Sequence, residues 1–437
     1  MDLQNKHILV VTSVYPLTPA NRDAPFVREV ILRLQPLGAK FTVFAPAYEG
    51  CKSHVLDGVK VYRFRYCPKR FENLARDGAP TKIQRQPLYL VAAALYILLG
   101  SWQLFWVCRK EKPDLLHINW PFPHGLMAMP ASILLGIPMV FTFHGTELNL
   151  VHKFGFVADT LRWLLPMASG VTANSSFTLG LIRKLYNGPV TVIPYGLTVE
   201  AIPPESRPPG EVPRLLFVGR LIERKGLSYL LEALPLVLAK QPVRLRVVGK
   251  GDSKEEFEQE CKALGLDAVV DFLGHLGKEK LAEEYASCDI FVLPSIVDSK
   301  GETEGLGIVM IEALAHEKPV VASAVGGIVD VIHSGNTGLL VPDKNPSALA
   351  EAILTLLSDP NRAQEMGRQG FKDVQARFSW SRITPMWLHI FAASMNKADS
   401  APNTVHLSGI TETVLTERTD ANEGTRLPVP QKSQSHH

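Results

Sequence analysis

Two series of short apolar segments, each alternating with stretches of helical periodicity, constrain the fold of this chain more than any other feature. Such alternation is typical of β-α-β units, in which parallel strands are buried on both faces and are therefore almost continuously apolar. The strands expected in the first series are residues 7–12, 40–44, 114–118, 138–143, 170–173 and 190–193, with a helix at 26–37. Those expected in the second series are residues 214–218, 245–248, 269–273, 290–293 and 319–322. The pattern predicts an α/β protein with two open parallel sheets and a cleft between them.

A proline-rich segment separates the two series and predicts a domain boundary. Five prolines fall between Ala201 and Pro213, too many for a regular element but suited to a semi-rigid linker. We therefore expect an N-terminal domain at 1–200, a linker at 201–213 and a second domain at 214–378. The segment 396–437 is rich in Ser, Thr, Asn, Pro and charge, and is expected to be a disordered tail.

Composition narrows the classes of function. With 437 residues, 46% hydrophobic, 20% charged and a net charge of +3, the chain has the composition of a globular protein, and its small charge argues against nucleic acid as the main partner. Its five cysteines include no C-x-x-C pair, so neither a disulfide framework nor a zinc site is expected. The N-terminus lacks the pattern of a signal peptide, and we expect a cytoplasmic protein.

An uncharged apolar stretch in the first series allows three interpretations. Leu88 to Cys108 contains no charged residue and is followed by Arg109 and Lys110. It suits a crossover helix buried in the domain, a helix lying on a membrane surface, or a helix that spans the membrane. A span would divide the sheet, because a strand begins just after it. Trp102 and Trp106 next to basic residues favour peripheral contact of residues 88–110 with the inner face of a membrane.

Two cations follow the first strand of the second series. Arg220 and Lys225 lie in the turn that begins with Gly219, and in an open parallel sheet such a turn faces the ligand crevice. A guanidinium and an ammonium suit the oxygens of a diphosphate and stabilise it as it departs. The alternative interpretation is an ordinary solvated turn.

An acidic, glycine-punctuated turn leads into an apolar helix further along. Glu304 and Glu312 are eight positions apart, and Gly305-Leu306-Gly307 lies between them. Backbone amides at such a turn and the positive end of the helix dipole favour an anion, while carboxylates bind hydroxyl groups. The alternative is a surface turn with capping or solvated glutamates.

The first series offers one histidine in a comparable place. His144 follows the expected strand 138–143 and precedes Gly145, on the first domain's side of the cleft. A packed structural role is the alternative, and Glu147 fits a helix cap equally well. The turn Val248-Gly249-Lys250-Gly251-Asp252 lacks the third glycine of a dinucleotide fingerprint, so no NAD site is expected.

The ordered set of these motifs resembles the retaining glycosyltransferases of GT-B fold, family 4, over about residues 7 to 390. The resemblance implies two facing Rossmann-like domains and a last helix, residues 379–395, that returns to the N-terminal domain. It also implies that Arg220 and Lys225 hold the donor diphosphate, that Glu304 faces the transferred sugar, and that His144 lies near the anomeric centre. The further binding residues that it implies are Gly305, Leu306 and Gly307 for the diphosphate, Glu312 for the ribose and Leu273 for the base.

One departure from the family concerns the loop after the first strand. Glycines are usual there, whereas this chain reads Tyr15-Pro16-Leu17-Thr18-Pro19-Ala20-Asn21-Arg22-Asp23. A diphosphate contact from this loop is therefore in doubt. The loop is expected to shape the acceptor site instead, with Arg22 or Asp23 exposed.

The motifs and the resemblance together predict a metal-independent hexosyltransferase without a cofactor, and the resemblance implies that it retains the configuration of the transferred sugar. The donor is expected to be a UDP-sugar or GDP-sugar, and no D-x-D metal signature accompanies the site. The acceptor is expected to be a glycan or a lipid-linked hydroxyl in polysaccharide or glycolipid assembly. The alternatives are a non-catalytic nucleotide-sugar-binding protein and a sugar-nucleotide epimerase on the same fold.

Overall fold

The computed structural model places nearly all of the two predicted β-α series. The described residues are 3–19, 21, 24–48, 50–74, 86, 88–197 and 211–396. Residues 1–395 form one compact unit that contains two β-sheets, one of eight strands and one of six. Arg22, Asp23, most of the expected linker and almost all of the expected tail lie outside the described residues.

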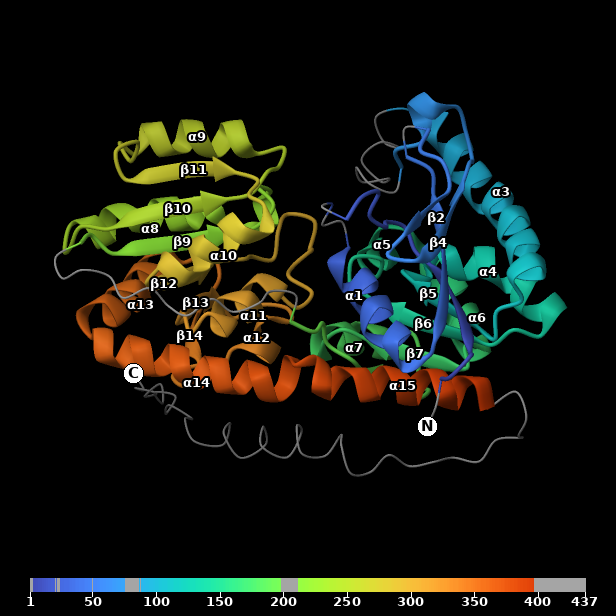
Figure 1. Ribbon diagram of the computed structural model, residues 1–437. Helices are drawn as coiled ribbons and strands as arrows, with labels where there is room; N and C mark the ends of the chain where they lie inside the picture. Colours follow the sequence, from blue (N-terminus) through green and yellow to red (C-terminus); the bar gives the residue numbers. More distant parts are fainter. Residues whose placement is uncertain are drawn as a thin grey trace, which may run out of the picture. The chain divides into compact units, whose positions relative to one another are not determined.

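The first sheet has the order β3-β4-β2-β1-β5-β6-β7-β8 (Figure 1). Its strands are β1 (His7–Val11), β2 (Lys40–Pro46), β3 (His54–Leu56), β4 (Val59–Phe64), β5 (Leu115–Asn119), β6 (Met139–Phe143), β7 (Gly170–Ala173) and β8 (Thr191–Val192). All neighbouring strands are parallel except β3 and β4, which form an antiparallel hairpin. Asp57 and Gly58 form the hairpin's turn with φ of 53° and 77°, the conformation that an Asp-Gly pair favours in tight hairpins.

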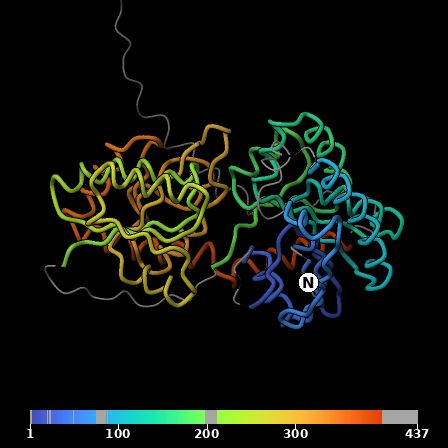
Figure 2. Tube along the Cα trace, turned by 90° about the horizontal axis from the view of Figure 1, so that it is seen from above, coloured from blue at the N-terminus to red at the C-terminus, as the bar shows by residue number. Residues whose placement is uncertain are grey.

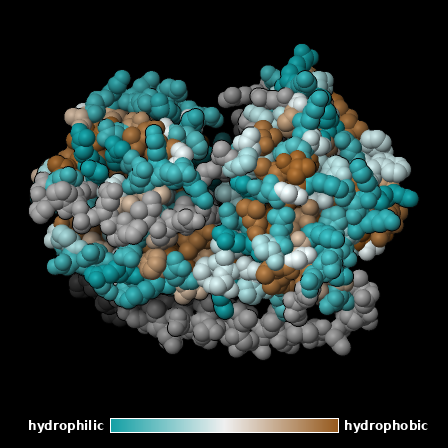
Figure 3. Space-filling view, viewed as in Figure 1, coloured by the Kyte–Doolittle hydropathy of each residue, from teal (hydrophilic) through white to brown (hydrophobic). Residues whose placement is uncertain are grey.

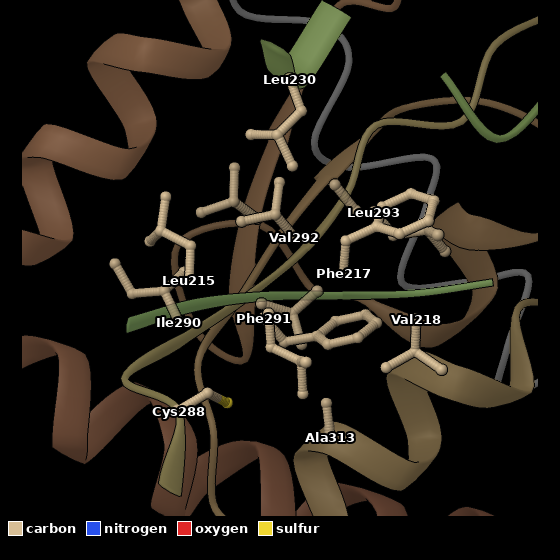
Figure 4. Close-up of a cluster of buried hydrophobic side chains, with 14 of the residues drawn as sticks. Leu215, Phe217, Val218, Leu230, Cys288, Ile290, Phe291, Val292, Leu293 and Ala313 are labelled. Carbon is tan, nitrogen blue, oxygen red and sulfur yellow. The ribbon is translucent and has the colours of Figure 1, made fainter. Parts of the chain in front are cut away.

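The second sheet has the order β11-β10-β9-β12-β13-β14, and all its pairings are parallel. Its strands are β9 (Arg214–Val218), β10 (Arg244–Val248), β11 (Val270–Gly274), β12 (Ile290–Leu293), β13 (Val320–Ser323) and β14 (Gly338–Val341). Phe217 on β9 and Phe291 on β12 lie among aliphatic side chains in the core of this half (Figure 4). Burial on both faces of the central strands explains why the sequence is continuously apolar there.

Helices connect the strands of both sheets. Those of the first half are α1 (Pro25–Leu34), α3 (Leu88–Glu111), α4 (Pro121–Leu135), α5 (Asn149–Lys153), α6 (Gly155–Leu164) and α7 (Ser176–Arg183). Those of the second half are α8 (Leu227–Leu238), α9 (Lys254–Ala263), α10 (Lys278–Ser287), α11 (Ile308–Ala315), α12 (Ile328–Val331), α13 (Pro346–Ser358), α14 (Pro360–Phe378) and α15 (Trp380–Asn396). The short 3₁₀ helices are η1 (Gln35–Leu37), η2 (Lys69–Phe71), η3 (Leu165–Met167) and η4 (Glu223–Lys225).

The N-termini of α13 and α14 show how local sequence defines helix boundaries. Asn345 accepts a hydrogen bond from the Ala348 amide and Asp359 accepts one from the Arg362 amide. A proline follows each of these caps at the first helical position, where its missing N–H breaks no helical hydrogen bond.

The last helix, α15, returns to the first half of the chain. Figures 1 and 2 show α15, in red, beside the blue and green elements of that half. Ile383, Trp387 and Phe391 of α15 are buried in a cluster with residues of β1, β2 and α1. The rings of Trp387 and Phe391 also contact buried His117 of β5, with centroids 5.1 and 5.0 Å away. The prediction of two Rossmann-like domains with a returning C-terminal helix is confirmed.

The apolar stretch from Leu88 to Cys108 forms most of α3, the connection between β4 and β5. One stripe of α3 is buried against α4 and the sheet, and it consists of Tyr89, Ala92, Tyr96, Gly100, Leu104 and Cys108. Within the described residues, α3 is the only helix long and apolar enough to cross a membrane by length and composition. Its buried stripe contributes to the core of this half, and a span would remove that stripe from its partners.

Both sheets reverse their strand order next to their first strand. In the first sheet β1 lies between β2 and β5, and in the second β9 lies between β10 and β12. Open parallel sheets bind ligands beyond the carboxyl ends of the strands at such a reversal. The residues that follow β9, β12 and β13, and those that end or follow β5, β6 and β7, are therefore the candidates for a functional site.

Two parts of the fold were not predicted. The β3–β4 hairpin was missed although Asp57-Gly58 and the alternating Val59–Phe64 segment indicate it. Strand β14 was missed because it is short, begins with Gly338 and has two half-buried residues at its centre. The predicted helix 26–37 is α1 followed by the 3₁₀ turn η1.

Candidate active site

A buried ion pair joins two of the predicted site residues. Lys225 ends η4, just after β9, and its Nζ donates a hydrogen bond to Oε2 of Glu304 in the loop after β12. Only 10% of the Lys225 side chain and 13% of the Glu304 side chain are exposed. Burial alone would raise the pKa of Glu304, but the charges of Lys225 and Arg224 outweigh it, and the pKa lies below its usual value. Glu304 is therefore an ionised carboxylate.

Two further cations lie beside this pair. Arg224 is buried, its Nη1 donates to the Thr303 carbonyl oxygen at 3.1 Å, and its Nε has no hydrogen-bond partner in the described structure. Arg220 is exposed and forms no side-chain hydrogen bond or ion pair with the described residues. Desolvation, followed by the charge of Arg224, lowers the pKa of Arg220, and the charge of Glu304 acts in the opposite direction. Without a hydrogen-bonded partner among the described residues, the Arg220 guanidinium is available for an anion, whereas the Lys225 ammonium is already paired with Glu304. Arg224 was not predicted as a site residue. The sequence feature that could have indicated it is its position next to Lys225.

Glycines allow the loops after β9, β10 and β12 to pack against each other. Gly226 has a φ of +69°, and a Cβ there would lie 1.8 Å from the Pro294 carbonyl oxygen. A Cβ on Gly249 would lie 1.8 Å from the carbonyl oxygen of Gly219. No side chain fits either place. The glycines after β10 thus serve loop packing.

The loop that bears Glu304 is supported by a glycine pair after β13. The Gly327 amide donates to the Glu304 carbonyl oxygen at 2.9 Å. Cβ atoms on Gly326 and Gly327 would lie 2.1 and 2.0 Å from the carbonyl oxygens of Glu304 and Gly305. Gly307, with a φ of +84°, is the N-cap residue of α11. The pair Gly326-Gly327 was not predicted; the feature that could have indicated it is a pair of glycines shortly after a strand.

Glu312, the predicted ribose ligand, lies within α11 and is buried. Its Oε2 accepts a hydrogen bond of 3.0 Å from the Tyr285 hydroxyl of α10. Leu273, the predicted neighbour of the base, is near the end of β11 and packs partly buried against the core of the second half. The roles of Glu312 and Leu273 stay predictions.

On the first sheet, His144 belongs to a chain of hydrogen-bonded side chains at the carboxyl ends of successive strands. His144 Nδ1 lies 2.8 Å from the Tyr195 hydroxyl, and its Nε2 lies 2.9 Å from Asn119 Oδ1. Asn174 Nδ2 donates to the Tyr195 hydroxyl at 3.0 Å. Because Tyr195 accepts from Asn174, its own proton is directed to His144 Nδ1, and the histidine proton lies on Nε2.

Burial keeps the His144 imidazole neutral. Desolvation lowers the pKa of His144 to about 3, and nearby His117 contributes to the same shift. The ring is also enclosed by aromatic neighbours, with its centroid 4.4 Å from that of Trp120 and 4.7 Å from that of Phe26. His144 is thus a fixed, uncharged group at neutral pH. Asn119, Asn174 and Tyr195 were not predicted, although the two asparagines end or follow strands as His144 does.

Glu147 fixes the loop that follows β6. Its Oε1 accepts the His144 amide hydrogen at 2.9 Å. Burial raises the pKa of Glu147 to about 7, although hydrogen bonds from backbone amides act in the opposite direction. Glu147 does not cap a helix as one interpretation expected: the N-cap residue of α5 is Leu148, without a side-chain cap, and Glu147 holds the amide of His144 instead.

The two halves of the candidate site touch each other. A Cβ on Gly305 would lie 3.0 Å from the His144 carbonyl oxygen, a tight contact that glycine avoids. Lys153 of α5 forms an ion pair with Glu302, and Nζ is 2.7 Å from Oε1. The amide and hydroxyl of Ser176, at the start of α7, both donate to the carboxylate of Asp330 in α12. The structure therefore brings His144 next to the loop of Glu304.

Comparison with known proteins agrees with the fold. The model of the family Glycosyltransferase Family 4 matches residues 24–201, and that of Glycosyl transferases group 1 matches residues 198–373. The putative teichuronic acid biosynthesis glycosyltransferase TuaC of Bacillus subtilis is 27% identical over 394 residues, which are 85% of this chain and 94% of TuaC.

Further similarity extends to an archaeal protein and a solved structure. The uncharacterized glycosyltransferase MJ1607 of Methanocaldococcus jannaschii is 35% identical over 181 residues, which are 41% of this chain and 45% of MJ1607. The crystal structure of Anabaena HepE in complex with UDP-glucose has a TM-score of 0.66 at 19% identity, with 89% of this chain and 99% of HepE covered. Together with the fold, the two adjoining family matches show that this chain belongs to the glycosyl transferases group 1 family.

Proposed function

We propose that this glycosyltransferase moves a hexose from a nucleoside diphosphate sugar to a hydroxyl acceptor, with retention of configuration and without a metal ion. The observation that carries the proposal is the grouping of Arg220, Lys225 and Glu304 at the strand reversal of the second sheet, with the loop of Gly305 against His144. Cations for a diphosphate and a carboxylate for sugar hydroxyls thus meet at one edge.

Donor binding is proposed to use the exposed cation first. Arg220 meets the diphosphate, and Lys225 shares its ammonium between that anion and Glu304. The amides of Gly305 to Gly307 lie at the N-terminus of α11, where the helix dipole favours negative charge. Glu304 then faces the transferred sugar, Glu312 the ribose and Leu273 the base. The UDP-glucose complex of HepE supports a uridine donor, and a GDP-sugar is the alternative to be tested.

In the proposed transfer, the bond between the anomeric carbon and the diphosphate oxygen breaks, and the acceptor oxygen bonds to that carbon. The acceptor proton leaves with the departing diphosphate, whose negative charge Arg220 and Lys225 stabilise. His144 is neutral and held at both ring nitrogens, so it orders the sugar side of the site and does not act as a base. Retention by front-face departure and attack needs no enzyme nucleophile, whereas a covalent intermediate requires one.

The proposed acceptor is a glycan or a lipid-linked glycan in the assembly of a surface polysaccharide or glycolipid. The relationship to TuaC, named for teichuronic acid biosynthesis, supports this class of product. The reaction is proposed to take place in the cytoplasm, where sugar nucleotides are made.

The test is a panel of UDP-sugars and GDP-sugars, with melting temperature and transfer to oligosaccharide or lipid-linked acceptors as readouts. A donor at 100 times its dissociation constant stabilises the protein by about 2.7 kcal/mol, which is readily measured. We expect Arg220→Ala to abolish both the shift and transfer. Arg244→Ala is the matched control, because Arg244 is also exposed but begins β10, at the opposite edge of the sheet. Full transfer by Arg220→Ala would overturn the proposed role of this site.

A further inference from the structure

The outward face of α3 is apolar along its length. Opposite the stripe that packs on α4, four exposed side chains follow one another at spacings of seven, four and four residues, which places them on one side of the helix. These residues, the outer stripe, are Val91, Leu98, Trp102 and Trp106. Trp102 and Trp106 are 62% and 53% exposed. Hydrophobic atoms, brown in Figure 3, gather at the edge where Figure 1 shows α3.

A band of positive charge borders this face. The exposed cations that form it, the basic rim, are Lys69, Arg70, Arg109, Lys110 and Lys112. The rim cations lie at the two ends of α3. Phe71, next to Arg70, packs on Tyr89 at 5.6 Å near the start of the helix, whereas the guanidinium of Arg109 lies over the ring of Trp106, 5.9 Å from its centroid, near the end.

The carboxylates of this region do not neutralise the basic rim. Within 59–74 and 88–112, all of which are described, the acidic residues are Glu72 and Glu111. Their side chains are 0% and 10% exposed, and they form ion pairs with Arg65 and Lys60, which lie outside the rim. The charge that these described segments present beside the outer stripe is therefore positive.

We propose that the outer stripe and the basic rim dock the enzyme on an anionic lipid bilayer, with α3 lying in the plane of the interface. Tryptophans prefer the headgroup level of a membrane, and lysines and arginines next to an apolar helix face are attracted by anionic lipids. A helix of 24 residues in this orientation offers a contact about 36 Å long. The buried stripe stays on α4, so docking requires no rearrangement of the core.

A protein partner fits the same face less well. A second copy of this chain in a symmetric dimer would place basic rim against basic rim, and like charges repel. An open hollow of about 440 Å³ lies beside Trp102 and Trp106, lined on its apolar side by Phe44, Tyr62 and Phe64 and on its polar side by Ser53, Arg63 and Gln103. A lipid, which has an apolar chain and a polar headgroup, suits such a mixed lining.

Membrane docking adds a partner to the proposed function. It rests on the proposed function in one respect only, namely that the acceptor is held at the membrane. Vesicle binding requires neither donor nor catalysis. Failure of docking and failure of the glycosyltransferase assignment are therefore separate results.

The experiment is co-sedimentation of the full-length protein with vesicles of phosphatidylcholine alone and with vesicles enriched in phosphatidylglycerol. We expect binding to the anionic vesicles, weakened by salt, and a loss of about tenfold or more in Trp102→Ser/Trp106→Ser. The double variant Arg70→Gln/Lys110→Gln is expected to bind less to anionic vesicles at low salt.

The matched control is Phe156→Ser/Trp163→Ser on α6, whose side chains are 62% and 54% exposed, close to those of the tryptophans replaced on α3. This control is expected to bind as the wild type does. Equal binding of Trp102→Ser/Trp106→Ser and wild type, or absence of binding to anionic vesicles, overturns the proposal. A wild-type dimer in light scattering that becomes monomeric in Trp102→Ser/Trp106→Ser would identify a second copy as the partner and also overturn it. Melting curves with donor show that each variant is folded.

Discussion

The ammonium of Lys225 and the carboxylate of Glu304 form a largely buried ion pair at the carboxyl edge of the second sheet, across 79 positions of sequence. One residue of this pair was expected to bind the diphosphate and the other the sugar. In the structure each is the other's partner, so a donor bound as proposed would share Lys225 with Glu304. This arrangement holds both side chains in place before the donor arrives.

Lys225→Ala is expected to destabilise the protein by about 3 kcal/mol, because it leaves the Glu304 carboxylate buried without its ammonium partner. Denaturant unfolding measures this free energy. Lys153→Ala is the control: it removes the partly exposed ion pair with Glu302 and is expected to cost about 1 kcal/mol or less. Equal losses in the two variants would contradict the interpretation of a buried pair.

Gly327→Ala is expected to weaken donor binding by about tenfold or more while the protein still folds. Its Cβ would lie 2.0 Å from the Gly305 carbonyl oxygen, so the loop between Glu304 and Gly307 has to move. Binding is measured from the donor-induced change in melting temperature. Gly180→Ala is the control, because this helical glycine has open space around its missing Cβ. It is expected to leave donor binding unchanged and to stabilise α7 by about 0.5–1 kcal/mol.

Tyr195→Phe is expected to lower kcat about tenfold with little change in the KM for the donor. The substitution keeps the stacked contact with Phe26, at a centroid distance of 4.3 Å, but removes the hydroxyl that fixes the His144 tautomer. Steady-state rates with a saturating acceptor measure both constants. Tyr186→Phe is the control, because Tyr186 lies three residues beyond the end of α7 and outside the site. A wild-type kcat in Tyr195→Phe would show that the hydrogen bond to His144 does not matter for transfer.

Stability is expected to fall as the pH drops from about 6.5 towards 4. Burial lowers the pKa of His117 and of His144 to about 3, and that of His124 to about 4, against about 6.5 in the unfolded chain. Between these values the unfolded state binds more protons, so the stabilisation that is complete above pH 6.5 is lost on acidification.

Glu147 acts with the opposite sign in the same range. Its pKa is about 7 in the folded protein, above the unfolded value, so the folded state holds this proton and gains stability as the pH falls below 7. The free energy of unfolding in urea is expected to fall by a few kcal/mol between pH 6 and pH 5 in the wild type, and to fall further in Glu147→Gln, which has lost the opposing carboxyl group. A variant with a smaller difference than the wild type would contradict this assignment.

The strands and the turn of Arg220 and Lys225 could be predicted without the structure, because both follow from the local pattern of apolar residues. A strand buried on both faces is apolar wherever it lies in the sheet, as in β1 and β9. The residues directly after such strands lie at the carboxyl edge, which placed Arg220 and His144 correctly at the edges of their sheets. Asn119 and Asn174 also lie at or directly after the ends of strands. They were missed because asparagine is a common loop residue and does not by itself indicate a site.

The remaining contacts of the candidate site could not be predicted, because they depend on which loops come together in the fold. The support of Gly305 by Gly327, the contact between Asp330 and Ser176, and the choice of Glu304 as the partner of Lys225 all arise between segments far apart in the chain. Strand order and the approach of the two halves bring these segments together, and neither leaves a periodic signal. By itself, the sequence determined two parallel α/β halves and the residue types at their edges, because burial is recorded locally in the pattern of apolar residues. Only the tertiary structure decided which charges pair and which nitrogen of His144 holds the proton, because those depend on distances across the site.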